Sequence, residues 1–133
     1  MTLQQQIEQF LGGSPHAVVG ASQDRSKYGN KVLRCYLQHQ RPAYPVNPKA
    51  TEIEGQTAYA DLASIPGAVH GVSIITPPAV TAQVVEQAAE LGIQHLWMQP
   101  GAESRQAAER AEALGLNVIP GTSCLLVVLG YQD

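Results

Sequence analysis

Short apolar runs alternate with segments of helical periodicity along the chain of 133 residues. This alternation is typical of β-α-β units, in which a helix joins each strand to a parallel neighbour. We therefore predict an α/β domain: a three-layer Rossmann-like fold with a five-stranded, mainly parallel sheet. The expected strands are 17–20, 43–46, 72–75, 96–98 and 117–119.

Helices are expected where apolar residues return at intervals of three and four. The clearest lies between Pro78 and Gly92, because proline suits the first turn of a helix and glycine its end. The other expected elements are helices over 3–11, 29–40 and 103–114, and a loop over 50–65 with a turn at Glu54-Gly55 and a short helix near Leu62.

Length and composition place the whole chain in one domain, 1–133, in which an amphipathic helix within 1–13 covers the sheet. The longest apolar runs, such as 125–129, are far shorter than the roughly 20 residues that a membrane-spanning helix needs. The N-terminus lacks a basic leader region. The two cysteines suggest free thiols in a reducing compartment. We therefore expect a cytoplasmic protein that does not contact membranes.

Basic residues are concentrated in one part of an acidic chain. The formal net charge is -3, yet most of the eight Lys and Arg residues fall between positions 25 and 49, with no Asp or Glu among them. Composition alone leaves a solvated helix face open as the explanation. The pattern suits one small, highly anionic ligand better than a nucleic acid. The residues of this basic segment are Arg25, Lys27, Lys31, Arg34, Arg41 and Lys49.

The carboxyl ends of the predicted strands share one rim, where open parallel sheets bind ligands. Gly20-Ala21-Ser22 is the strongest phosphate candidate, because glycine permits close approach and the following helix presents free N–H groups. The dinucleotide fingerprint GxGxxG is not met, since the next glycine is Gly29. The second strand ends in Asn47-Pro48-Lys49, where an NAD site needs an acidic residue. A cation there favours a phosphorylated ribose, which both NADP and coenzyme A (CoA) carry.

Four motifs together carry a resemblance: Val18-Val19-Gly20-Ala21-Ser22, Tyr44-Pro45-Val46-Asn47-Pro48, Leu96-Trp97-Met98-Gln99-Pro100-Gly101 and a late Cys124. In this order they resemble the small, single-domain CoA-binding protein family, whose fold is like the N-terminal domain of the succinyl-CoA synthetase alpha subunit. The resemblance covers roughly residues 10–128. It implies that the ligand is CoA or a short acyl-CoA.

The resemblance also implies a role for each turn on the rim. Residues 20–22 would cradle the pyrophosphate, 47–49 would meet the ribose-phosphate, 76–78 would line the adenine or pantetheine groove, and 99–101 would contact the pantetheine arm. Lys49 aligns with a CoA-contacting lysine of the synthetase, although Pro48 replaces the glycine before that lysine. The predicted binding residues are Gly20, Ala21, Ser22, Arg25, Lys27, Tyr28, Gly29, Asn47, Pro48, Lys49, Ile75, Thr76, Pro77, Pro78, Gln99, Pro100 and Gly101.

No catalytic or metal site is predicted. The four histidines and two cysteines show no ligand-like spacing, and the glutamates fall at exposed helical positions that give no acid/base pair. The synthetase forms its phosphohistidine and binds nucleotide in other domains, and we expect neither here. The sequence therefore predicts non-catalytic binding. Two other classes stay open: an NADP-binding redox sensor or accessory subunit, and an interaction module without ligand. An unidentified protein partner also stays open.

For four further residues the sequence gives weaker indications of whether they are buried or exposed. Trp97 and Cys35 are expected in the core. His16, at a strand entrance, is expected on the polar surface. Cys124 precedes an apolar run and is expected to be buried, with a mixed disulfide to CoA as the less favoured alternative.

Overall fold

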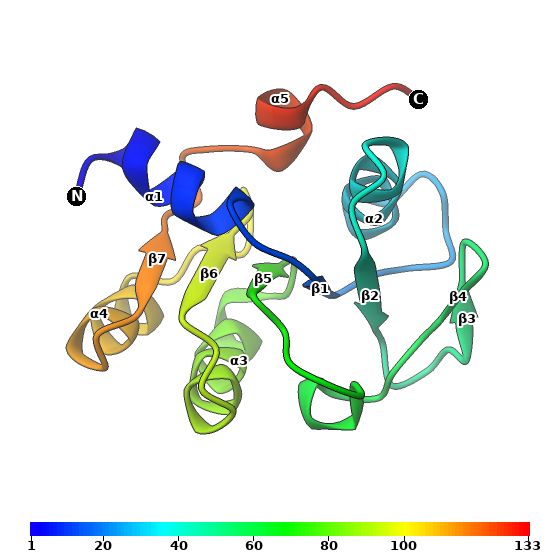
Figure 1. Ribbon diagram of the computed structural model, residues 1–133. Helices are drawn as coiled ribbons and strands as arrows, with labels where there is room; N and C mark the ends of the chain where they lie inside the picture. Colours follow the sequence, from blue (N-terminus) through cyan, green and yellow to red (C-terminus); the bar gives the residue numbers. More distant parts are fainter.

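A five-stranded parallel sheet forms the centre of the computed structural model, which describes residues 1–133 (Figure 1). The strands lie in the order β2-β1-β5-β6-β7, and every neighbouring pair is parallel. The predicted strands are confirmed to within a residue or two. Their bounds are β1 His16–Val19, β2 Ala43–Val46, β5 Gly71–Ile74, β6 His95–Met98 and β7 Asn117–Ile119.

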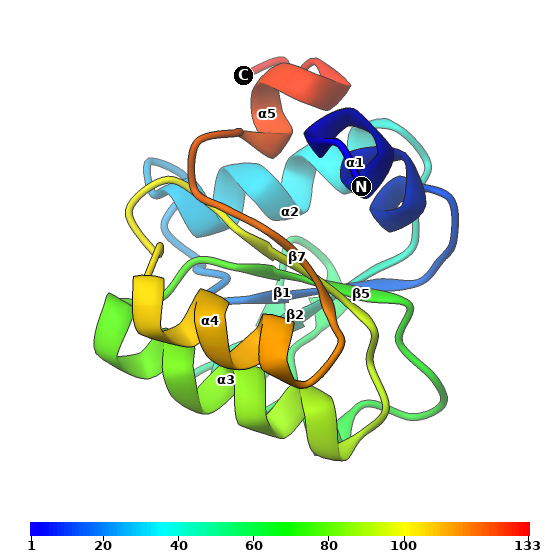
Figure 2. The same ribbon diagram turned by 90° about the vertical axis from the view of Figure 1, so that its left-hand side faces the viewer.

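Helices cover both faces of the sheet, so the predicted three layers are confirmed (Figure 2). One face carries α1 (Leu3–Leu11), α2 (Tyr28–Gln38) and α5 (Leu125–Leu129), and the other carries α3 (Pro78–Glu90) and α4 (Arg105–Ala113). None of these helices combines the length and apolar character required to cross a bilayer.

The helix ends follow local capping chemistry. The predicted helix 103–114 begins two residues later, because Ser104 is its N-cap and the Ser104 side chain accepts from the N–H of Ala107 at 3.2 Å. Helix α1 packs over β7, where Gln6 Nε2 donates to the carbonyl of Val118 at 3.0 Å. The short helix α5 was not expected.

The segment between β2 and β5 contains more structure than the predicted loop. Strands β3 (Glu52–Ile53) and β4 (Gln56–Thr57) form a hairpin around the predicted turn, in which Glu54 and Gly55 have φ of 51° and 77°. The short helix expected near Leu62 is the 3-10 helix Leu62–Ser64, whose N-cap Asp61 accepts from the N–H of Ser64.

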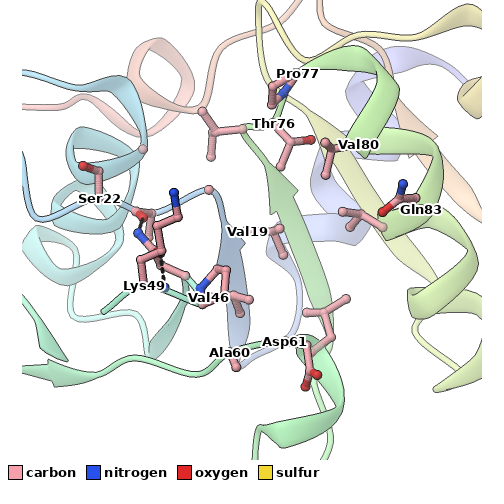
Figure 3. A pocket seen from close by; sticks show the side chains of 18 of the residues that line it. Val19, Ser22, Val46, Lys49, Ala60, Asp61, Thr76, Pro77, Val80 and Gln83 are labelled. Atoms are coloured by element: carbon pink, nitrogen blue, oxygen red, sulfur yellow. Dashed lines mark hydrogen bonds between the residues drawn. The ribbon is translucent and has the colours of Figure 1, made fainter. Parts of the chain in front are cut away.

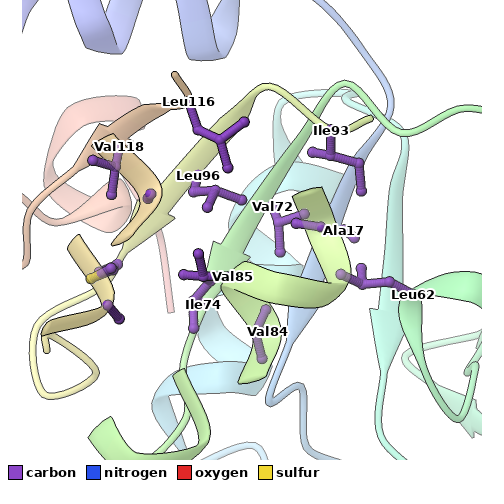
Figure 4. Packing of buried hydrophobic residues seen from close by; sticks show 14 of the residues in the cluster. Ala17, Leu62, Val72, Ile74, Val84, Val85, Ile93, Leu96, Leu116 and Val118 are labelled. Carbon is purple, nitrogen blue, oxygen red and sulfur yellow. The ribbon is translucent and has the colours of Figure 1, made fainter. Parts of the chain in front are cut away.

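Alternate residues of each central strand enter two separate cores. Ala17 packs toward α3 and α4, in the cluster drawn in Figure 4, whereas its neighbour Val18 packs toward α1, α2 and α5. Strand β1 is therefore buried on both faces, as its apolar sequence predicts. Trp97 is fully buried in the second core, where its Nε1–H donates to the carbonyl of Ser123 at 3.1 Å. Its predicted core position is confirmed.

His16 is buried, so its expected place on the polar surface is wrong. The strand begins at His16 itself, and α1 and α2 close over it. Its Nε2 lies 2.7 Å from the carbonyl of Phe10, and its ring stacks on Tyr36 at a centroid distance of 5.1 Å. Burial lowers the pKa of His16 from 6.5 to about 4.

The buried His16 predicts a loss of stability in acid. Above pH 6.5 the ring is neutral in both states, and below that value the unfolded chain gains a proton that the folded protein resists until about pH 4. Over this window we expect His16 to lower the free energy of unfolding by about 3 kcal/mol. Urea unfolding at pH 7 and pH 4 measures the change. His16→Gln should flatten the dependence, whereas the same replacement of the exposed His39 should leave it unchanged. Equal slopes in all three proteins would contradict this assignment.

Candidate functional site

The strand order reverses between β1 and β5. From β1 the chain passes through α2 to β2 on one side, and it later returns through β5 on the other side. Ligands of open α/β sheets bind at such a reversal, beyond the carboxyl ends of the strands. A cavity of about 890 Å³ lies there (Figure 3). This volume is within the range of small-molecule and cofactor sites.

Most of the predicted binding residues line this cavity. They come from the loop after β1, the start of α2, the end of β2 and the end of β5. In Figure 3, Ser22 and Lys49 lie on one side of the cavity, and Val80 and Gln83 of α3 lie on the other. The predicted residues brought together are Gly20, Ala21, Ser22, Lys27, Tyr28, Gly29, Asn47, Pro48, Lys49, Ile75, Thr76 and Pro77.

The remaining predicted residues lie outside the cavity lining. The Nε of Arg25 lies 3.5 Å from a carboxylate oxygen of Glu54. Pro78 begins α3, and Pro100 and Gly101 form an exposed turn. Gln99 is fully buried. A contact of these residues with a pantetheine arm therefore stays a prediction.

The basic segment of the sequence does not form one basic surface. Lys27 and Lys49 line the cavity, and neither forms an ion pair. Lys31 and Arg34 instead lie 3.9 and 3.5 Å from the Asp133 carboxylate. Arg41 donates to the carbonyl of Leu11 at the end of α1. Only two of the clustered cations are therefore placed to attract a ligand into the cavity.

Two glycines allow the loop after β1 to lie against its neighbours. Gly20 has φ of +96°, and a Cβ there would lie 1.8 Å from the carbonyl oxygen of Ile75. A Cβ on Gly29 would lie 2.0 Å from the carbonyl oxygen of Gly20. Gly20 therefore allows the loop to contact the end of β5, and Gly29 allows the start of α2 to contact the loop. These contacts fix the position of the α2 N-terminus at the cavity.

The N-terminus of α2 presents unpaired N–H groups. Its N-cap Lys27 makes no side-chain cap, and the N–H groups of Tyr28, Gly29 and Asn30 have no protein acceptor. A helix of 11 residues also places partial positive charge at this end. Lys27 adds a full charge beside it. This combination has the chemistry that helix N-termini use to bind phosphate.

Asn47 holds the two turns of the cavity together. Its Nδ2 donates to the carbonyl of Ala21 at 2.9 Å, and its Oδ1 accepts from the N–H of Lys49 at 2.8 Å. Each polar atom of the amide expected to meet a ligand therefore has one partner within the protein. It positions the loop after β1 and the backbone of Lys49.

Sequence reasoning missed the wall of the cavity formed by α3 and by residues 60–62. The signal for α3 was present, because positions spaced by three and four residues share one helical face. The segment 60–62 had no periodicity that could have identified it. The missed residues are Val19, Val46, Ala60, Asp61, Leu62, Val80, Gln83, Val84 and Gln87.

The fold and the position of the cavity together define an α/β domain of the Rossmann-like class. Residues 15–130 match the family described as "CoA binding domain". The chain belongs to this family, and the resemblance seen in the sequence is confirmed.

Larger acyl-CoA ligases contain similar domains. The alpha subunit of acetate–CoA ligase [ADP-forming] II from Pyrococcus furiosus is 27% identical in an alignment of 130 residues, gaps included, that covers 90% of this chain and 28% of the relative. A solved structure of "Candidatus Korarchaeum cryptofilum" dinucleotide-forming acetyl-coenzyme A synthetase 1 is 28% identical with a TM-score of 0.75. The match covers 86% of this chain and 28% of the synthetase. The chain thus spans less than a third of each of these ligases.

A hypothetical protein from Pyrococcus horikoshii OT3 is similar over nearly its whole length. Its structure superposes with a TM-score of 0.88 and 30% sequence identity. The match covers 96% of this chain and 89% of the other. The same fold therefore also occurs in chains of about this size.

Proposed function

We propose that the protein binds CoA or a short acyl-CoA in the cavity between β1, β2 and β5. The observation that supports this proposal best is the meeting of two unpaired lysines, Lys27 and Lys49, with the unpaired N–H groups of α2 around one cavity. CoA carries a diphosphate and a separate ribose 3′-phosphate. Two separate cations on one cavity fit such a ligand.

The geometry gives each phosphate a different partner. The diphosphate would lie over the loop 20–22 and accept from the free N–H groups at the start of α2, beside Lys27. Lys49 comes from the end of β2, on the same side of the cavity as Ser22 (Figure 3). It would contact the ribose 3′-phosphate, because an ammonium group binds phosphate as a point charge.

The rest of the cavity suits the uncharged parts of the ligand. Val46, Leu62, Val80 and Val84 supply an apolar wall against which an adenine ring can pack. Thr76 would line the groove along which the pantetheine arm leaves. Because the arm ends in a thiol, free CoA and short acyl-CoA share all the contacts named here.

We propose further that this chain alone does not convert its ligand. Among the cavity residues, the side chains that could exchange protons are Lys27, Tyr28, Lys49 and Asp61. The Oδ1 of Asp61 accepts from both the N–H and the hydroxyl of Ser64, so it serves the turn rather than a nucleophile. With the protein present, acetyl-CoA hydrolysis and ADP formation from ATP, acetate and CoA should be no faster than in buffer alone. Turnover that scales with protein concentration would refute this proposal.

Titration of the nucleotide-free protein tests the ligand directly. At one fixed salt concentration, calorimetry with CoA, 3′-dephospho-CoA, NADP and NAD should give tight binding of CoA alone. Loss of the 3′-phosphate should weaken binding roughly tenfold, because a charge-assisted contact disappears. Preference for NADP would overturn the proposal in favour of a redox protein. Absence of binding by all four would favour an interaction module.

A further inference from the structure

The thiol of Cys124 lies one side chain away from the proposed CoA cavity. Tyr28 lines this cavity, and its hydroxyl is hydrogen-bonded to Sγ of Cys124. Cys124 is partly exposed, so its expected burial is wrong. The reason is its place as the N-cap of α5, at the edge of the apolar cluster rather than inside it.

A buried amide beside this pair lacks a partner. The Oε1 of Gln99 accepts from the hydroxyl of Tyr28 at 3.2 Å and from the N–H of Leu125 at 2.9 Å. Because the N–H of Leu125 can only donate, the amide oxygen must face it. The Nε2 of the same fully buried amide therefore has donors to offer and no acceptor. An unpaired buried donor costs free energy, and the amide carbonyls of a pantetheine arm are acceptors that would relieve it.

We propose that Cys124 is a site of reversible modification by CoA disulfide, held for reaction by the cavity. The inference rests on the proposed CoA binding. In the reaction, Sγ of Cys124 attacks one sulfur of the CoA disulfide, whose S–S bond breaks as the new S–S bond to Cys124 forms. The second CoA leaves as a thiolate and takes up the proton that Cys124 lost. The disulfide is the only oxidant, and a thiol reverses the step.

Tyr28 is arranged to assist this step. Burial and the hydrogen bond with Cys124 raise the pKa of Tyr28, so its hydroxyl stays protonated. Its single proton, which is directed to Oε1 of Gln99 at rest, can turn to the sulfur as negative charge develops there. Hydrogen bonds to charged groups are stronger than those to neutral ones, so Tyr28 should lower the barrier to thiolate attack.

The second cysteine is not a competing site. Cys35 is fully buried in α2. Burial raises the pKa of its thiol to about 11, which leaves almost no thiolate at neutral pH. The expected core position of Cys35 is confirmed by its burial.

Mass spectrometry of the intact protein tests the inference. Incubation with CoA disulfide should add one CoA, peptide mapping should place it on Cys124, and dithiothreitol should remove it. Glutathione disulfide has no adenosine diphosphate for the cavity and should react at least roughly tenfold more slowly if binding supplies effective concentration. Cys124→Ser should abolish the adduct, and Cys35→Ala should retain it. Tyr28→Phe should slow the reaction roughly tenfold.

The outcomes separate this inference from the proposed function. Calorimetry on Cys124→Ser should still detect CoA, because the thiol is not one of the phosphate contacts. CoA binding without an adduct would overturn the role of Cys124 and leave the proposed function intact. Equal rates with glutathione disulfide would overturn it too, since the cavity would then contribute nothing. Absence of CoA binding in every variant would overturn both.

Discussion

Gly20→Ala should destabilise the protein by at least about 3 kcal/mol and abolish CoA binding. The new Cβ would lie 1.8 Å from the carbonyl oxygen of Ile75, which is backbone and has no rotamer with which to move away. The loop is also fixed on both sides. The N–H of Gly20 donates to the carbonyl of Val46, and the N–H of Ile75 donates to that of Val19. A shift large enough to remove the clash would break these bonds at the ends of β1, β2 and β5.

Gly101→Ala is the matched control for this substitution. Gly101 has φ of +95°, against +96° for Gly20, but a Cβ there would meet nothing within 4 Å. Gly101→Ala should therefore lose only about 1–2 kcal/mol of stability, which is the cost of an alanine in left-handed backbone. The difference between the free energies of unfolding of the two variants, measured in urea, gives the cost of the contact between the loop after β1 and the end of β5. Equal losses of stability would show that backbone conformation alone requires glycine at position 20.

The sheet was predictable because parallel strands that are buried on both faces need continuous apolar runs. Ala17-Val18-Val19 shows such a run, and the order of strands and helices then places all the carboxyl-end turns on one rim. This reasoning located most of the cavity residues. It did not require knowledge of which strands are neighbours, since any parallel order brings those turns to the same edge.

Other features depend on partners that are distant in the sequence. Arg34 appears in the basic segment, yet it is nearly buried and is bonded to Asn30 and to Asp133, at the far end of the chain. His16 looks like a polar residue at a strand entrance until α1 folds over it. Gln99 ends a strand, and its amide oxygen accepts from the N–H of Leu125 in α5. Each of these positions depends on a contact that no local pattern records.

Helix α5 shows how tertiary context overrides propensity. The run Leu125–Leu129 contains two adjacent β-branched residues, Val127 and Val128, which favour strands. Only Leu125 is fully buried, where it joins the core beneath α2, and Val127 is 80% exposed. The run is thus anchored at one end, and the spacing of its apolar residues gave no indication of a single short helical turn.

Charge reversal at Lys27 should weaken CoA binding roughly 100-fold, because it removes a charge-assisted contact and adds repulsion at the α2 N-terminus. Lys31→Glu is the matched control. It changes the net charge equally, one turn further along the same helix, but Lys31 lies outside the cavity and near Asp133. We expect a loss below about threefold there, since exposed charges act weakly at a distance. Unfolding temperatures should show that Lys27→Glu folds normally, because Lys27 makes no ion pair.

Lys49→Glu distinguishes the two phosphate positions. If Lys49 contacts the ribose 3′-phosphate, its reversal should weaken CoA roughly 100-fold but change the affinity for 3′-dephospho-CoA only slightly. Lys27→Glu should weaken both ligands by the same factor, since both keep the diphosphate. Calorimetry of both variants with both ligands therefore gives a thermodynamic cycle for each lysine. Only for Lys49 should the effect of charge reversal on the affinity depend on the 3′-phosphate. Coupling at Lys27 instead would mean that the ligand lies the other way round in the cavity, with its ribose-phosphate at the start of α2.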